Sequence, residues 1–160
     1  MVNTGVSKLR DEEFLQVIKN APLVSVDLIV RNPRDEIFLA FRKNQPAKGY
    51  WFVPGGRILK DETIDNAFQR IVETDLRVHK DFKDADFLGV FEHFYQENRF
   101  ETADFGTHYV VLAYEINVSE TLELSGTNEH ASHKWSSVSD LLSDAEVHPN
   151  TKTFFCRRPA

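Results

Sequence analysis

The segment that decides the fold is residues 51–78, WFVPGGRILKDETIDNAFQRIVETDLRV. It begins with a short apolar stretch, which predicts an extended strand that Pro54 ends. Gly55 and Gly56 follow, and they allow a tight turn in which backbone groups can point at a ligand. Apolar residues then recur at helical spacing, so the segment predicts a helix over residues 64–76.

Asp75 is the unusual residue of this predicted helix. At about 100° per residue it falls within the apolar face, in the last turn, where the helix dipole disfavours a further negative charge. A buried carboxylate there needs a proton or a cation. The structural alternatives are a salt bridge to Arg or Lys and a frayed helix end that reaches water. The apolar face consists of Ile64, Ala67, Phe68, Ile71, Val72 and Leu76.

The rest of the chain contains short strand patterns and a few helical segments. Strands on both sides of the predicted helix, with helices near both ends, indicate an α+β fold in which a mixed β-sheet is sandwiched between helices. A length of 160 residues suits a single domain over residues 1–160. We expect helices at 11–21, 139–144 and 150–157, strands at 23–30, 36–42, 51–53, 87–95, 108–118 and 134–136, a turn at 32–35 and a loop at 45–49.

The formal net charge of -6 argues against nucleic acid or an anionic membrane surface as a partner, because both require a basic surface. No apolar run approaches the roughly 18 residues of a membrane span, and the N-terminus lacks the apolar core of a signal peptide. The single cysteine, Cys156, excludes an internal disulfide framework and a cysteine-based zinc site. We therefore expect a cytoplasmic enzyme or binding domain.

Three residues of the 51–78 segment have a specific joint spacing. Glu62 follows Gly56 after five intervening residues, and Arg70 follows Glu62 after seven. With this spacing the segment resembles a Nudix box, G-x5-E-x7-R-E-U-x-E-E-x-G-U, in which U is aliphatic, and Val72 and Val78 also match. The resemblance implies the Nudix fold and a hydrolase that acts on a nucleotide-linked diphosphate.

The box of this chain lacks most of its metal-binding acids. Ile71 and Thr74 stand where two glutamates are expected, Asp75 stands at the third position, and Arg77 replaces the glycine. Ordinary Nudix hydrolases gather several Mg2+ ions on those acids, so such a cluster is not expected here. One hard divalent cation remains compatible with few protein ligands and the substrate's own phosphates.

A depleted box of this kind is similar to that of one Nudix branch, the GDP-mannose mannosyl hydrolases. The similarity covers residues 11–158. Enzymes of this branch attack carbon C1 of the sugar with water and release GDP with inversion. One Mg2+ per subunit, which Mn2+ can replace, clamps the departing diphosphate. The matching segments are residues 22–30 (PLVSVDLIV), 45–57 (QPAKGYWFVPGGR), 60–63 (KDET), 93–95 (HFY), 108–112 (HYVVL) and 147–151 (VHPNT).

The resemblance implies three metal ligands and a general base. The ligands are the backbone carbonyl of Gly55, the carboxylate of Asp75 and Glu129, and the base is His130. The branch usually has an amide where this chain has Glu129, whose charge could compensate for the shorter Asp75 or disturb His130. An imidazole that titrates near neutrality suits a general base. His133 is a competing candidate, and for His130 a surface-loop histidine is the structural alternative.

Arg42, Arg57 and Tyr109 match residues that hold the diphosphate in this branch, and Lys43 is expected to assist Arg42. Charged donors stabilise a departing phosphate oxygen, so Arg42 and Tyr109 are expected to contribute to catalysis as well as to binding. For Arg42, the alternative is a solvated strand end.

Asp27 and His93 lie inside predicted strands. A carboxylate within an apolar strand needs a partner. The resemblance places Asp27 at the active site as a catalytic residue near sugar or base hydroxyls, and a structural ion pair is the alternative. His93 and Tyr95 resemble the active-site wall of the branch. His93 is therefore expected to bind substrate, with ordinary packing of half-buried aromatic rings as the alternative.

The expected function is the hydrolysis of GDP-mannose, or of GDP-glucose, to GDP and free hexose by a homodimer. Two alternatives stay open. One is an ordinary Nudix hydrolase that splits the diphosphate, against which the missing acids argue. The other is an inactive Nudix module that binds a nucleotide sugar. The substitutions at Asp75 and Glu129 keep the second alternative open, because a misplaced metal lowers the rate.

Overall fold

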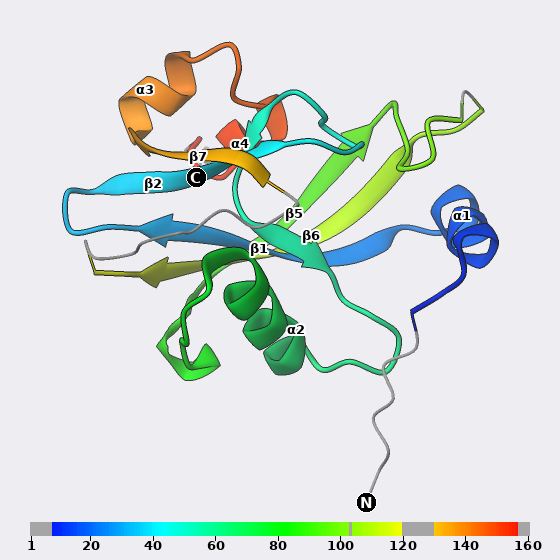
Figure 1. The fold of residues 1–160 in the computed structure, drawn as a ribbon, viewed down its shortest axis with the longest axis horizontal. Coiled ribbons are helices and arrows are strands. Elements are labelled where there is room, and N and C mark those ends of the chain that lie inside the picture. The colour runs from blue at the N-terminus through cyan, green and yellow to red at the C-terminus, as the bar shows by residue number, and fades with distance from the viewer. Residues whose placement is uncertain (1–7, 103, 120–129, 157–160) are drawn as a thin grey trace, which may run out of the picture.

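The computed structural model describes residues 8–102, 104–119 and 130–156, with the backbone alone at residues 130 and 131. This part of the chain forms a seven-stranded sheet with helices on both faces (Figure 1), which confirms the predicted α+β class. The elements are α1 Asp11–Asn20, β1 Leu23–Arg31, β2 Glu36–Arg42, β3 Trp51–Phe52, β4 Gly55–Arg57, α2 Ile64–Ile71, a π-turn Val72–Leu76, a 3-10 turn Phe82–Asp84, β5 Asp86–Tyr95, β6 Thr107–Asn117, β7 His130–Ser137, α3 Val138–Ser143 and α4 Pro149–Thr153.

The sheet is mixed, as the sequence predicted. Its strands follow the order β3-β2-β1-β6-β5, while β4 pairs with β1 and β7 pairs with β2 outside this path. β1 and β6 run parallel, with Ser25 opposite Val111, and the other pairs are antiparallel. β1 therefore lies at the centre and contacts β2, β4 and β6.

The two faces of the sheet carry separate cores, because side chains alternate along β1. On one face Val26 packs with Phe68 of α2. On the other face Ile29 packs with Leu141 of α3, and α4 lies on the same side (Figure 1). Alternation places Asp27 on the face opposite Val26, so β1 presents its acid away from the core beneath α2.

α2 begins at Thr63, whose Oγ1 accepts a hydrogen bond from the Asn66 backbone N–H at 3.1 Å. Asp65 in the first turn complements the positive end of the helix dipole. Ile64, which the sequence predicts on the apolar face, is 39% exposed. The prediction is wrong for this residue because the core beneath α2 begins one turn later, at Ala67.

The last turn of the predicted helix is not α-helical. Residues Val72–Leu76 form a π-turn. A π-turn has more residues per turn than an α-helix, so the rotation per residue is smaller than the roughly 100° on which the prediction rests. Asp75 therefore leaves the centre of the apolar face and lies half-buried, after the exposed Thr74. Arg77 stands at the glycine position of the box and ends the turn with φ 54°, a left-handed conformation that glycine adopts most easily.

Among the strands and α-helices, three further differences from the prediction exceed one residue. Residues Gly55–Arg57 form a strand, β4, because their lack of bulk at the glycines lets them pair with β1. β7 runs over His130–Ser137 rather than 134–136, since it pairs with β2 along that length. α4 ends at Thr153, where the chain turns to place the Phe154 ring on the sheet. Among the described residues, no helix is long and apolar enough to cross a membrane.

Candidate active site

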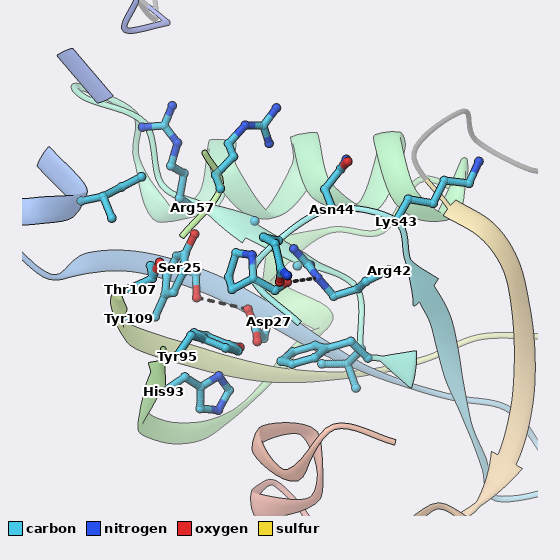
Figure 2. Close-up of a pocket in the computed structure, with 18 of the residues that line it drawn as sticks. Ser25, Asp27, Arg42, Lys43, Asn44, Arg57, His93, Tyr95, Thr107 and Tyr109 are labelled. Carbon is cyan, nitrogen blue, oxygen red and sulfur yellow. Dashed lines mark hydrogen bonds between the residues drawn. The ribbon is translucent and has the colours of Figure 1, made fainter. Parts of the chain in front are cut away.

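A pocket of about 240 Å³ lies where β1, β4 and the end of β2 meet α1 and the loop between β5 and β6 (Figure 2). Residues far apart in the sequence meet in it. Every predicted site residue whose side chain the structure describes lines this pocket, as does the predicted backbone ligand: Asp27, Arg42, Lys43, Gly55, Arg57, Asp75, His93 and Tyr109.

Asp27 is the buried carboxyl group of the pocket and is 6% exposed. Ser25 Oγ donates a hydrogen bond to Asp27 Oδ1 at 3.2 Å (Figure 2). Burial raises the pKa of Asp27 to about 7; the hydrogen bond from Ser25 and the charge of Arg42 act in the opposite direction, and the charge of Asp75 raises it further. Asp27 can therefore exchange a proton near neutral pH, which suits acid or base chemistry.

Gly55 lets β4 run directly against Asp27. A Cβ at this position would lie 2.5 Å from Asp27 Oδ1 and 2.9 Å from the carbonyl oxygen of Val26. Any larger residue would displace the carboxylate or the backbone of β1. Packing alone therefore requires a glycine here, beside the carboxyl group of the pocket.

Cationic side chains surround the opening of the pocket, namely Arg42, Lys43, Arg57 and Arg99. Arg42 Nε donates to the carbonyl oxygen of Pro46 at 2.8 Å, which fixes its guanidinium (Figure 2). Within the described part of the chain, no carboxylate lies within ion-pair distance of these four cations. In a chain of net charge -6, this local concentration of positive charge suits an anionic ligand.

Arg57 contacts α1 through its guanidinium group. Its Cζ is 3.8 Å from the centroid of the Phe14 ring, a cation–π contact. Burial lowers the pKa of Arg57 below its ordinary value, the Tyr109 phenol raises it, and the neighbouring charges of Arg99 and Arg70 lower it further. Since the ring covers one face of the guanidinium, the donors along its edge remain for a ligand.

Glu62 and Arg70 hold the box loop together. Arg70 Nε donates to Glu62 Oε1 at 2.7 Å, and a second Arg70 nitrogen donates to the carbonyl oxygen of Arg57 at 2.9 Å. Glu62 also accepts a hydrogen bond from the Leu59 backbone N–H at 2.9 Å. These two matches to the box therefore tie the last turn of α2 both to the loop that precedes this helix and to β4.

Of the three box positions that carry acids in the Nudix pattern, Asp75 is the one that lines the pocket. Ile71 is buried in the core beneath α2, and Thr74 is exposed. In the described ranges, no three His, Cys, Asp or Glu side chains gather to hold a metal ion. The Asp75 carboxylate and the Gly55 carbonyl are oxygen donors, which fit a hard cation such as Mg2+ that keeps several waters.

Neutral hydrogen-bonding groups form the buried wall of the pocket. His93 is 1% exposed, and its Nε2 has no hydrogen-bond partner among the described residues. Burial lowers the pKa of His93 to about 4, with a smaller contribution from His148, so the ring is neutral at pH 7. Burial also raises the pKa of Tyr95 and of Tyr109, which keeps both phenols protonated.

The expected general base and third metal ligand are described only in part. Glu129 lies outside the described residues. The backbone of His130 lies opposite Arg42 in the pairing of β7 with β2, and its side chain lies outside the description. The ring of the competing candidate, His133, stacks on Phe38 with centroids 5.5 Å apart and does not line the pocket.

Three further pocket residues, Ser25, Phe14 and Arg99, were not predicted from the sequence. Ser25 has a usable signal, because it lies two residues before Asp27 and therefore on the same face of a strand. Phe14 and Arg99 carry no such signal. They reach the pocket through the docking of α1 and the folding of the β5–β6 loop.

Comparisons with known proteins identify the family and the fold of this chain. A family model described as NUDIX domain matches residues 21–157. The low-salt glycan biosynthesis protein Agl8 of Haloferax volcanii is 40% identical over 114 residues, which cover 71% of this chain and 70% of that protein.

Solved structures share the fold at lower identity. The MutT protein from Methanosarcina mazei Go1 has a TM-score of 0.67 and 20% identity, covering 85% of this chain and 92% of that one. The NUDIX domain of Shewanella oneidensis NrtR, complexed with ADP ribose, has a TM-score of 0.63 and 19% identity, covering 92% of this chain and 96% of that one. These matches confirm the fold expected from the box, and the chain belongs to the Nudix family of hydrolases.

Proposed function

We propose that the protein hydrolyses GDP-mannose, or GDP-glucose, to GDP and free hexose, with water attacking C1 of the sugar and inverting it. The observation that carries the proposal is the depleted box, in which Asp75 lines the pocket while Ile71 belongs to the core. One box carboxylate is too few for the several ions of a diphosphate-splitting site. Attack at the sugar carbon requires fewer metal ions, because the metal only has to reduce the negative charge of the departing GDP.

In this reaction the water oxygen forms a bond to C1 while the bond between C1 and the phosphate oxygen breaks. The electron pair of that bond leaves with GDP, and the proton of the water passes to His130 as general base. Arg42 and the protonated Tyr109 donate to the phosphate oxygen on which negative charge develops. Lys43 and Arg57 add positive charge around the same anion.

The buried wall of the pocket suits the hydroxyl groups of a sugar. Asp27 accepts from Ser25 and retains further acceptor capacity, and the neutral His93 has an Nε2 without a protein partner among the described residues. A buried polar atom of this kind is normally satisfied by a ligand or water. Asp75, the Gly55 carbonyl and Glu129 would hold one Mg2+ per subunit, with Mn2+ as a substitute, and the bound ion would offset the charge of the diphosphate.

The relatives support a nucleotide-linked sugar as the class of substrate. The 40% identical protein is named for glycan biosynthesis, a process that consumes activated sugars. The Shewanella oneidensis NUDIX domain, which has the same fold, is complexed with ADP ribose, a nucleoside diphosphate joined to a sugar.

The test is product analysis in 18O-water, with GDP-mannose and Mg2+. Attack at C1 places the label in free mannose and leaves GDP unlabelled. GMP and mannose 1-phosphate would show instead that the protein splits the diphosphate. Binding without turnover would identify an inactive module. GDP-glucose is assayed in parallel to define the preferred hexose.

A matched pair of variants in β7 identifies the base in the same assay. His130→Gln should lower kcat by roughly 100- to 10,000-fold, which is the usual contribution of a general base. His133→Gln should keep a rate near that of the wild type, because its ring packs on Phe38. An unchanged kcat in His130→Gln would remove this histidine from the reaction.

A further inference from the structure

Arg99 is a pocket residue that neither the box nor the surrounding motifs contain. It lies in the loop that joins β5 to β6 and lines the same pocket as Arg57. The two side chains are close enough that the charge of Arg99 lowers the pKa of Arg57 and acts on Tyr109 in the same way. Two guanidinium groups from different segments therefore face one opening.

The loop that carries Arg99 is held in one shape by a buried asparagine. Asn98 is 0% exposed. Its Nδ2 donates to the carbonyl oxygens of Thr102 at 2.9 Å and Phe105 at 2.8 Å, and its Oδ1 accepts from the Phe100 backbone N–H at 3.0 Å. At the base of the loop, Thr107 Oγ1 donates to the carbonyl oxygen of Glu97 at 2.8 Å.

The residue after Arg99 is anchored as well. The Phe100 ring contacts the Phe14 ring of α1 with centroids 6.0 Å apart, and Phe14 also supports the Arg57 guanidinium. Arg99 thus stands between two anchored neighbours, Asn98 and Phe100. Its backbone position is set by packing, although its own side chain is exposed.

The pair of guanidinium groups has no acidic partner in the described ranges, although the chain has more acids than bases, with 25 Asp and Glu against 19 Lys and Arg. Two like charges held together repel each other unless an anion lies between them. Guanidinium donors match the paired oxygens of a phosphate group in geometry as well as charge.

We propose that Arg99 is a substrate-binding residue that, together with Arg57, binds the diphosphate of the substrate. Arg57 lies two residues after Gly55 in β4, and the proposed function places the Gly55 carbonyl at the Mg2+ that would offset the charge of the diphosphate. Arg42 and Lys43 approach from the end of β2. The diphosphate is therefore held from two sides, by β2 and by the β5–β6 loop.

The experiment measures the dissociation constants of GDP, inorganic pyrophosphate and guanosine by isothermal titration calorimetry, in one buffer that contains Mg2+. Arg99→Ala should raise the dissociation constants of GDP and pyrophosphate by roughly 10- to 100-fold, which corresponds to the loss of a charge-assisted hydrogen bond. The dissociation constant of guanosine should stay unchanged. Arg99→Lys should recover part of the loss, because it restores the charge without the fork of donors.

Arg34→Ala is the matched control. Arg34 is an exposed arginine in the β1–β2 hairpin, where Asn32 organises the turn much as Asn98 organises the β5–β6 loop, and it pairs with Glu36 outside the pocket. Arg34→Ala changes the net charge by the same amount as Arg99→Ala. Because Arg34 lies outside the pocket, the three dissociation constants should stay at their wild-type values. Thermal unfolding of all three variants confirms that each is folded.

The outcomes separate this inference from the proposed function, on which it rests. If Arg99→Ala binds pyrophosphate as the wild type does, or if it loses affinity for guanosine alone, the assignment of Arg99 to the diphosphate is wrong. If pyrophosphate binding falls as expected but the 18O assay yields GMP, the inference stands and the proposed reaction is rejected. A wild-type protein that binds neither GDP nor pyrophosphate would reject both.

Discussion

Burial controls the chemistry of individual side chains in this pocket, and His93 is the clearest example. Its ring lies among aromatic neighbours, with centroids 6.0 Å from Phe52 and 5.3 Å from Phe154. Burial removes the water that would stabilise an imidazolium there, and the neighbouring His148 disfavours its charge further, so the pKa of His93 falls from 6.5 to about 4. The folded protein therefore releases this proton more readily than the unfolded chain does.

This shift predicts a loss of stability in acid. The contribution of the neutral His93 is fully present above pH 6.5, the unfolded-state value, and is lost as the pH falls toward about 4. Between pH 8 and pH 5 the wild type should lose about 2 kcal/mol of unfolding free energy through this group. His93→Phe and His93→Gln, which cannot titrate, should both lack this part of the loss.

Urea unfolding at pH 8 and pH 5 measures the effect for the three proteins. Phe preserves the aromatic packing and Gln preserves a polar group. If both variants show the same reduced pH dependence, the effect comes from the titration of His93 and not from its packing. A pH dependence in both variants equal to that of the wild type would show that His93 keeps an ordinary pKa.

At the scale of elements, the Glu62–Arg70 pair of the Nudix box connects the loop before α2 to that helix. Glu62 is 3% exposed at its side chain, and Arg70 is 39% exposed. The hydrogen bond from Arg70 holds the pKa of Glu62 below its ordinary value. Because Arg70 also reaches the backbone of Arg57, the pair fixes β4, and β4 in turn sets Gly55 against Asp27.

Glu62→Ala should therefore lower the unfolding free energy by about 2 kcal/mol, since it removes the hydrogen bonds that Glu62 accepts from Arg70 and from the Leu59 backbone. Glu73→Ala is the control, because it removes an exposed carboxylate from the π-turn that follows α2. It should change the unfolding free energy by about 0.5 kcal/mol or less. Chemical denaturation of both variants decides the matter. Equal stabilities for the two would mean that the Glu62–Arg70 pair does not hold the loop.

In the whole molecule, one sheet lies between two hydrophobic cores, and both cores pack against the same strands. α2 covers the core that contains Phe68, and α3 and α4 cover the core that contains Leu141 (Figure 1). The two tryptophans of the chain report on opposite sides, because Trp135 packs against the first core and Trp51 against the second. Because the two cores share these strands, we expect them to unfold as a single cooperative unit.

Two single-tryptophan variants test this cooperativity. Trp51→Phe leaves Trp135 as the fluorescent reporter, and Trp135→Phe leaves Trp51. Within each variant, the fluorescence transition in urea should coincide with the far-UV circular dichroism transition. Transitions that separate by probe in either variant would show that the two faces of the sheet unfold independently.

The sequence by itself determined the local features of this protein. The spacing of Gly56, Glu62 and Arg70 identifies the box, and the periodicity around it predicts the helix and the strands. These patterns can be recognised in the sequence because they depend on residues that are close together in the chain. Local reasoning also selected Asp27 as a site candidate, since an acid stands out in an apolar strand, whereas Arg42 was selected through the resemblance of its segment to the branch.

Only the tertiary structure decided which side chains share the pocket. The π-turn brings Asp75 to its edge, burial neutralises His93, and the β5–β6 loop delivers Arg99 beside Arg57. Each of these depends on contacts between segments that are distant in the chain. Burial, electrostatic coupling and loop shape arise only when those segments pack, and so no local pattern in the sequence encodes them.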